Sequence, residues 1–166
     1  MSSTDVTAAP ETELPGPNPL DMRVEVVVVP VSDVDRSRQF YEQLGWKFDT
    51  ELATDDGIRL IQFTPPGSLC SVTFGTGITS AEPGSVRSLV LAVHDVEASR
   101  AELVARGVDV SEVFHDAGGV FHHTGTDGRV PGPNPERRSY ASWASFTDPD
   151  GNEFFLQEIT SRLPGR

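Results

Sequence analysis

Three of the four histidines in this chain lie in one short stretch, where they could act as a general base near neutral pH. They are His115, His122 and His123, with Asp116 and two consecutive glycines at positions 118 and 119 among them. The ordinary pKa of histidine lies close to neutral pH, so its ring can exchange protons there. The glycines supply the backbone freedom of a hinge. One hypothesis is therefore a flap that brings a general base, or polar anchors, onto a substrate.

Two other interpretations of these residues remain open. In the second, the histidines are exposed side chains of a glycine-rich loop, which is common for histidines in such segments. In the third, His115, His122 and His123 bind a metal, although their spacing fits neither a helical nor a hairpin pair of ligands. These three histidines are our candidate catalytic residues. Arg137 and Arg138 follow them and either bind a carboxylate, face solvent or bridge subunits.

The elements that must position these residues repeat along the chain. A shift of 62 residues aligns positions 31–45 with positions 93–107, and six of the fifteen positions are identical. Each copy follows an apolar, β-branched run and contains an aspartate that would cap a helix and a glycine that would end it. The sequence therefore predicts two related halves, each with a strand, a helix and three further strands.

In the first half, residues 23–31 predict a central strand with both faces covered, because the run is too apolar for a strand with one face exposed to solvent. Ser32 or Asp33 would cap the following helix, and Gly45 would end it. The remaining strands, separated by turn signals, are predicted at residues 46–54, 58–64 and 69–75.

In the second half, a strand is predicted at residues 86–93 and a helix from about Val96 to Arg106, between the cap Asp95 and the stop Gly107. The remaining strands are predicted at residues 108–114, 139–147 and 153–159. Residues 115–138 form an insertion that is far longer than a hairpin needs. Unstructured segments of this length are usually functional lids or disordered surface.

The predicted domain organisation follows from these elements. Residues 22–78 form the first module, and residues 85–160 form the second module with the insertion 115–138. Residues 1–21 contain four prolines, four acids and no base, and predict a disordered acidic tail. Residues 161–166 form a second, shorter tail.

Composition excludes several classes of partner. The 166 residues include 13 basic and 25 acidic side chains, and the resulting formal charge of -12 repels both nucleic acid and an anionic membrane surface. No apolar run has the roughly 20 residues of a membrane-spanning helix. A single cysteine, Cys70, cannot form an internal disulfide and suits a reducing compartment. We therefore expect a cytoplasmic protein.

The repeat and two motifs resemble a known superfamily. The motifs are VSDVDRSRQFYEQLGW at residues 31–46 and FTDPDGNEFFLQE at residues 146–158. Together they resemble the vicinal oxygen chelate superfamily, which is also called the glyoxalase, bleomycin-resistance and dioxygenase superfamily, over roughly residues 23–160. The resemblance implies an α+β fold, in which tandem βαβββ modules form two cupped mixed sheets around a central cavity. It also implies a homodimer and a small-molecule ligand or substrate.

Enzymes of this superfamily usually hold one divalent metal, and the resemblance locates its ligands in this chain. The implied positions are Val26, Ser88, Phe155 and either Ser71 or Thr73. Valine and phenylalanine offer no lone pair, and serine and threonine are weak neutral donors. We therefore expect neither the usual metal centre nor another cofactor, while a divalent metal at a different site remains an open alternative.

The resemblance also implies which side chains face the cavity. Residues that alternate along the strands would line one face, and these candidates are Val26, Val28, Ser88, Val90, Trp143, Phe155 and Gln157. This largely apolar set is typical of a small-molecule site.

The first functional hypothesis is metal-free binding of an apolar or aromatic molecule, of the resistance or sequestration type. The alternative is a glyoxalase-like lyase or isomerase, or a dioxygenase-type enzyme, that uses the flap histidines or a non-standard metal site. In a third hypothesis, side chains fill the cavity and the protein is an interaction partner.

Overall fold

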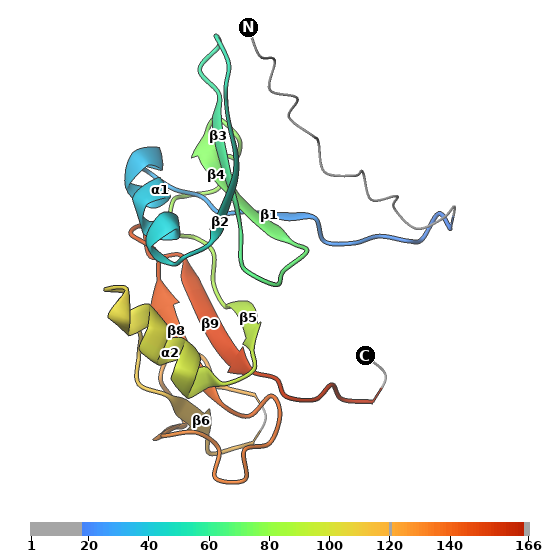
Figure 1. The fold of residues 1–166 in the computed structure, drawn as a ribbon, viewed down its shortest axis with the longest axis vertical. Helices are drawn as coiled ribbons and strands as arrows, with labels where there is room; N and C mark the ends of the chain where they lie inside the picture. The colour runs from blue at the N-terminus through green and yellow to red at the C-terminus, as the bar shows by residue number, and fades with distance from the viewer. Residues whose placement is uncertain (1–17, 120, 165–166) are drawn as a thin grey trace, which may run out of the picture.

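The two halves of the chain form two mixed β-sheets (Figure 1). The structure is a computed structural model that describes residues 18–119 and 121–164. Most of the predicted acidic tail, up to residue 17, and residues 165–166 lie outside these described residues. The strand order is β1-β4-β3-β2 in the first sheet and β5-β9-β8-β6-β7 in the second. The predicted α+β class and its pair of mixed sheets are confirmed.

The first half contains one helix and four strands. Their bounds are β1 Val26–Val28, α1 Val34–Gln43, β2 Lys47–Ala53, β3 Arg59–Thr64 and β4 Ser71–Thr76. Asp33 caps α1 as predicted, because its carboxylate accepts a hydrogen bond from the backbone N–H of Arg36 at 2.9 Å. Gly45 follows the helix with φ of 78°, the left-handed conformation that favours glycine.

The second half repeats this arrangement and adds a strand. Its elements are β5 Leu89–Val93, α2 Val96–Ala105, β6 Phe114–Asp116, β7 Arg129–Pro131, β8 Trp143–Thr147 and β9 Glu153–Glu158. Asp95 caps α2 through the backbone N–H of Ala98 at 2.9 Å, and Gly107 follows the helix in the left-handed region. In each sheet the first strand pairs in parallel with the last strand of its half, β1 with β4 and β5 with β9.

The prediction of a covered central strand at residues 23–31 is wrong. Strand β1 has three residues and lies at the edge of its sheet. Along the strand and the residue after it, the side chains alternate: Val29 is buried in the core, whereas Val26 and Val28 are 41% and 39% exposed. The continuous apolar run therefore reflects a second apolar face that nothing in the described part of the chain covers.

Two expectations for the second half also require correction. Residues 108–114 do not form a strand, because Val110 makes only an isolated bridge to Phe146 and β6 begins at Phe114. Their alternating valines are buried by packing against the core without a ladder of hydrogen bonds. The insertion is not wholly irregular either, since its residues 129–131 form β7 and pair with β6. This hairpin widens the second sheet to five strands.

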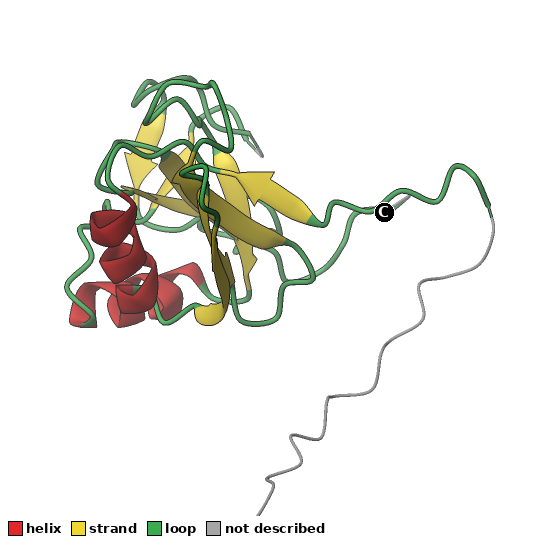
Figure 2. Ribbon diagram, turned by 90° about the horizontal axis from the view of Figure 1, so that it is seen from above, coloured by secondary structure: helices red, strands yellow, loops and turns green. Residues whose placement is uncertain are grey.

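One hydrophobic core joins the two halves. Both helices lie on the same side of the sheets (Figure 2). Between the helices and the sheets, Tyr41 of α1 packs against Phe74 of the first sheet and Phe154 of the second, with ring centroids 4.9 and 6.3 Å apart. The other aromatic members of this cluster are Phe40, Trp46, Phe63 and Phe146. The other face of each sheet points away from the helices (Figure 2).

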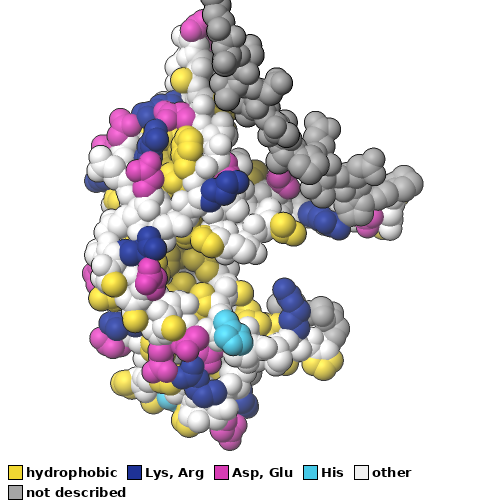
Figure 3. Space-filling model, in the orientation of Figure 1, with side chains coloured by type: hydrophobic (Ala, Val, Ile, Leu, Met, Phe, Trp, Pro, Cys, Tyr) yellow, Lys and Arg dark blue, Asp and Glu magenta, His cyan; other side chains and the backbone are white. Residues whose placement is uncertain are grey.

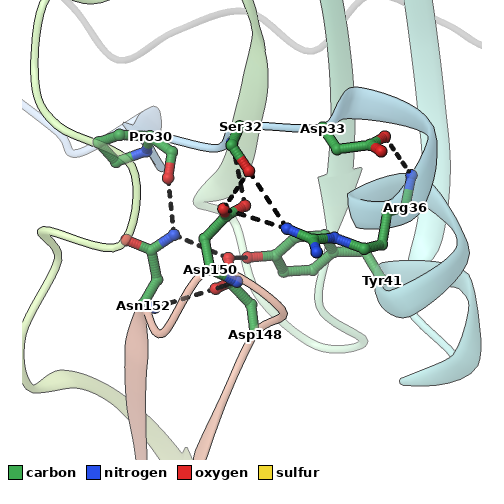
Figure 4. A network of polar contacts seen from close by, with 8 residues as sticks. All are labelled: Pro30, Ser32, Asp33, Arg36, Tyr41, Asp148, Asp150 and Asn152. Carbon is green, nitrogen blue, oxygen red and sulfur yellow. Dashed lines mark hydrogen bonds and ion pairs between the residues drawn. The ribbon is translucent and has the colours of Figure 1, made fainter.

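A buried polar network holds the halves together where the two sequence motifs meet (Figure 4). Asp148 accepts hydrogen bonds from the Tyr41 hydroxyl at 3.0 Å and the Asn152 amide at 2.8 Å. The same amide donates to the carbonyl of Pro30 at 2.8 Å, and Asp150 accepts from the backbone N–H of Ser32 at 3.0 Å. Burial raises the pKa of Tyr41 well above its ordinary value, and the charge of Asp148 raises it further. The motifs therefore carry the contact between the modules.

Within the described residues, no helix has the length and apolar character that crossing a membrane requires.

Candidate ligand-binding site

A small aromatic cluster lies on the second sheet, apart from the main core. It consists of Phe114, Trp143 and Phe155, which are 3%, 4% and 2% exposed. They come from three strands, β6, β8 and β9, and Phe114 is directly paired with Trp143. Phe154 and Leu156 alternate with Phe155 and belong to the main core. The cluster therefore lies on the face that points away from the helices.

The insertion covers this cluster with a histidine. The imidazole of His122 stacks on the ring of Phe155, with centroids 4.3 Å apart and an angle of 21° between the planes. It also meets Trp143 edge-on, with centroids 4.8 Å apart. The insertion thus folds back over the sheet, and His122 shields aromatic surface that would otherwise face solvent.

An arginine of the insertion completes the cluster. The guanidinium carbon of Arg129 lies 4.0 Å from the ring centroid of Phe114 and 5.9 Å from that of Phe155. Such a position allows a cation–π interaction. Among the described residues, the buried Nε of Arg129 and the buried Nε1 of Trp143 have no hydrogen-bond acceptor. The site therefore combines aromatic surfaces with two unused hydrogen-bond donors.

A carboxylate anchors the insertion beside the cluster. Asp116 is buried and accepts hydrogen bonds from the Gly118 backbone N–H at 2.7 Å and the His123 backbone N–H at 3.0 Å. The Nδ1 of His123 lies 2.6 Å from the same carboxylate. The His123 side-chain hydrogen bond holds the pKa of Asp116 below its ordinary value, with help from the Gly118 N–H. These contacts fix the turn that presents His122 to Phe155.

The three candidate histidines therefore have different surroundings. His122 lies on the aromatic cluster and His123 pairs with Asp116, whereas His115 places its Nδ1 2.9 Å from the carbonyl of Gly132. His115 lies between Phe114 and Asp116 on β6, so its side chain points to the opposite face of the sheet. The structure does not bring the three rings together.

Two of the other predicted cavity residues, Val90 and Gln157, lie on the same face of the second sheet. Val90 is the register partner of Phe155, and it is exposed. Gln157 is buried and pairs with Trp143, and its amide donates to the carbonyl of Tyr140 at 2.9 Å. Ser88 precedes β5 with φ of 57° and is exposed. The equivalent face of the first sheet carries Val26 and Val28.

Next to those two valines, the first sheet is polar. Ser71 and Thr73 are the register partners of Val26 and Val28. Ser71 and Thr64 share a hydrogen bond of 2.7 Å between their hydroxyls, and the Thr73 hydroxyl donates to the Gln62 carbonyl oxygen at 3.3 Å. The Thr64 hydroxyl in turn donates to Asp49. These serine and threonine hydroxyls are therefore already engaged with neighbouring side chains.

The residues at the positions that the superfamily uses for a metal do not fit one. Val26, Ser88 and Phe155 offer no strong ligand atom, and Ser71 and Thr73 are neutral hydroxyls within the network above. Residues 18–119 and 121–164 also contain no group of three or more histidine, cysteine, aspartate or glutamate side chains arranged to hold a metal ion.

Arg137 and Arg138, the pair that follows the candidate histidines, have separate partners. Arg137 bonds Glu158 of β9 at 2.6 Å and Glu97 of α2 at 2.6 Å. These two carboxylates raise the pKa of Arg137. Arg138 lies 3.4 Å from the exposed Glu136. Arg137 therefore ties the end of the insertion to α2 and β9 and is not available to a ligand.

Two of the hollows in the described part of the chain border α2 and the insertion. The larger, of about 620 Å³, lies between α2, β5 and the turn at residues 65–68, and Trp46, Phe146 and Leu156 form part of its lining. Figure 3 shows hydrophobic side chains at the floor of a hollow between the two halves. The smaller, of about 270 Å³, is lined by Asp116, Gly118, Phe121, His122 and His123. We place the site at the aromatic cluster beside the smaller hollow, because His122 lines that hollow and stacks on Phe155.

The sequence indicates neither Phe114 nor Arg129 as a neighbour of the site, whereas Asp116 lies among the candidate histidines. Phe114 and Asp116 are two residues apart on β6, so their side chains point to the same face. The sequence predicts Phe114 as the end of a strand and Asp116 as part of the insertion. The one available signal was the pattern RVP at residues 129–131, a short β-prone run inside the insertion that forms β7.

Comparisons with known proteins agree with this fold. Residues 23–156 match the model of the Glyoxalase/Bleomycin resistance protein/Dioxygenase superfamily. The chain therefore belongs to that superfamily. The resemblance that the sequence motifs indicated is confirmed. None of the curated protein sequences matches the chain.

Several solved structures are similar to the chain. The antibiotic binding protein TnmS3 from Streptomyces sp. CB03234 is 29% identical with a TM-score of 0.60, over 83% of this chain and 96% of that chain. A glyoxalase/bleomycin resistance protein from the same organism is 30% identical with a TM-score of 0.57, over 80% of this chain and 96% of that chain. A superfamily member from Sphaerobacter thermophilus DSM 20745 shares the fold, at 24% identity and a TM-score of 0.58, over 82% and 96% of the two chains.

Proposed function

We propose that this protein binds and sequesters a planar aromatic small molecule, without a metal centre, at the cluster of Phe114, Trp143 and Phe155. The observation that carries the proposal is the cluster itself: three rings from three strands lie on one sheet face, under a single loop histidine. Aromatic rings provide large apolar contact area and preferred stacking geometries. A flat ligand that took the place of His122 on Phe155 would meet Trp143 at its edge.

Two further observations support this proposal. The positions at which the superfamily binds a metal hold valine, serine and phenylalanine in this chain. In addition, a structure that is 29% identical over most of both chains is described as an antibiotic binding protein. Sequestration requires affinity and shape but no reacting group, which fits a site made of rings and hydrogen-bond donors.

Thermal unfolding in the presence of a panel of planar aromatic compounds, antibiotics among them, tests the proposal. A ligand specific for the folded state at about 100 times its dissociation constant adds roughly 2.7 kcal/mol of stability and raises the melting temperature. Phe155→Leu keeps an apolar side chain but removes the ring, so we expect it to abolish the shift. Phe48→Ala, which removes an exposed ring from the first sheet, is the matched control. If no compound of the panel raises the melting temperature of the wild-type protein or of Phe48→Ala, binding is contradicted. Stoichiometric metal in elemental analysis would contradict the metal-free site.

An enzyme of the glyoxalase-like lyase, isomerase or dioxygenase type is the second candidate. The pair of Asp116 and His123 favours it, because a carboxylate that orients an imidazole is a common arrangement for a general base. Under this candidate, His123→Ala abolishes turnover of a bound compound and leaves its dissociation constant nearly unchanged. Under sequestration, the bound compound is recovered unaltered from the wild-type protein.

A further inference from the structure

Two buried donors at the aromatic cluster have no partner. Within the described part of the chain, Arg129 Nε and Trp143 Nε1 are both shielded from water and lack an acceptor. The guanidinium and indole groups donate hydrogen bonds and cannot accept them. A buried donor without a partner is unfavourable, and native proteins contain few of them. Any group that satisfies these two atoms must therefore supply acceptors.

Among the described residues, the charge of Arg129 is also without a counterion at ion-pair distance. Most arginines of this acidic chain have one: carboxylate oxygens lie 2.6 Å from Arg38 and 2.8 Å from Arg59. Asp116 is the register partner of Arg129 in the β6–β7 hairpin, but no ion pair within 4.0 Å joins them. Its oxygens instead accept from Gly118 and from two nitrogens of His123.

The position of Arg129 suits the recognition of an anion that is joined to an aromatic ring. Its guanidinium lies over Phe114 and about 6 Å from Phe155, the ring on which the ligand would stack. A guanidinium that lies over a ring face keeps its N–H groups free at the edges, and their fork matches the two oxygens of a carboxylate. Trp143, 96% buried, adds a neutral donor in the same cluster.

We infer that the ligand of this site is a planar aromatic acid, whose anionic oxygen group is bound by Arg129 and Trp143 while its ring lies against Phe155. The inference rests on the proposed function and narrows its ligand class. An apolar aromatic molecule would leave both buried donors unpaired. An aromatic cation would be repelled by the positive charge of Arg129.

Calorimetric titration with two probes of nearly equal shape, 2-naphthoate and 2-naphthamide, tests this inference at neutral pH. We expect the wild-type protein to bind the carboxylate about tenfold more tightly, because hydrogen bonds between charged groups are roughly twice as strong as neutral ones. Arg129→Met is expected to lower the affinity for naphthoate to that for naphthamide. Arg106→Met removes the same charge from the end of α2, and the preference should persist.

Trp143→Phe provides a second, independent variant, because it keeps an aromatic ring and removes only the N–H donor. It is expected to lower the affinity for each probe roughly threefold, since both probes present an oxygen that can accept the hydrogen bond. Equal binding of the two probes by the wild-type protein, or an undiminished preference in Arg129→Met, overturns the inference and leaves the proposed function intact. If neither probe binds at millimolar concentration, the proposed function fails and this inference fails with it.

Discussion

The imidazole of His122 lies flat against the ring of Phe155, at 4.3 Å between centroids and 21° between planes. It therefore occupies the surface on which an aromatic ligand would stack. In this arrangement the ligand must displace His122, and the lost stacking interaction lowers the apparent affinity. His122→Ala is expected to raise the affinity for 2-naphthoate by about two- to tenfold, the equivalent of one aromatic pair.

His94→Ala is the matched control, because His94 is exposed near the start of α2 and far in sequence from the insertion. It should leave the affinity unchanged. A weaker complex with His122→Ala would show instead that the imidazole stacks on the ligand from the other side. Titration calorimetry of the three proteins decides between these outcomes.

The two tyrosines of the chain allow a direct test of the network between the modules. The Tyr41 hydroxyl donates to the buried carboxylate of Asp148, whereas the buried Tyr140 hydroxyl has no partner in the described part of the chain. Tyr41→Phe is therefore expected to lower the free energy of unfolding by about 1–3 kcal/mol. Tyr140→Phe should change it little or raise it slightly. Urea unfolding measures both, and equal losses would contradict a specific role for the Tyr41–Asp148 contact.

The same contact predicts how stability depends on alkaline pH. Burial and Asp148 raise the pKa of Tyr41 in the folded protein above its ordinary value of 10.0. The contribution of this neutral phenol is fully present below pH 10 and is lost as the pH rises through the folded-state pKa. Unfolding curves above pH 10 should therefore show a decline in the wild-type protein that is smaller in Tyr41→Phe. Identical declines would mean that other groups dominate alkaline unfolding.

Much of the fold was predictable because its signals are local. Asp33 and Asp95 cap their helices, and Gly45 and Gly107 follow them in the left-handed region, as the repeat indicated. Local signals do not say which strand lies at a sheet edge, so the apolar run at residues 23–31 predicts a central strand although β1 lies at an edge. Its second apolar face points away from the helices, and an apolar run has the same appearance whether that face is covered or open.

The site was less predictable, because its chemistry depends on contacts between distant residues. His122 was identified from its type and spacing, but its stacking on Phe155 requires the insertion to fold back onto β9. Arg129 was missed, since an arginine in a loop is usually solvated or paired, and only the packed structure reveals an Nε without an acceptor. The paired arginines at positions 137 and 138 suggested a carboxylate site, and the carboxylates near Arg137 belong to the chain itself.

These adjacent arginines differ in the burial of their partners, which predicts different energetic roles. Glu158, which Arg137 bonds at 2.6 Å, is almost fully buried. Arg137→Gln leaves this carboxylate with the Val96 N–H but without its cation, and is expected to cost about 1–3 kcal/mol of stability. Arg138→Gln breaks only the exposed pair with Glu136 and should cost less than about 1 kcal/mol. Thermal unfolding of the two variants should separate them, and comparable losses would contradict this assignment.

The carboxylate of Asp116 is expected to control the order of residues 117–119 and 121–128. It accepts hydrogen bonds from Gly118 N–H and His123 N–H and lies 2.6 Å from His123 Nδ1. Asp116→Asn replaces one acceptor oxygen by an NH₂ group, which cannot satisfy all three of these contacts. Hydrogen exchange in residues 117–119 and 121–128 should therefore become about tenfold faster. Asp127→Asn, an exposed change in the same loop, should leave the exchange unchanged.

Acidification of the wild-type protein should have the same effect on the insertion as the Asp116→Asn substitution has at neutral pH. The pKa of Asp116 lies below its ordinary value of 3.8, chiefly through the hydrogen bond from the His123 side chain. A lowered carboxyl pKa stabilises the folded state fully above pH 3.8, and this contribution disappears as the pH falls through the folded-state pKa. Exchange of the insertion should thus accelerate below pH 3.8 in the wild-type protein and much less in Asp116→Asn. The same acceleration in both proteins would show that another group releases the loop, and His122 would then leave Phe155 independently of Asp116.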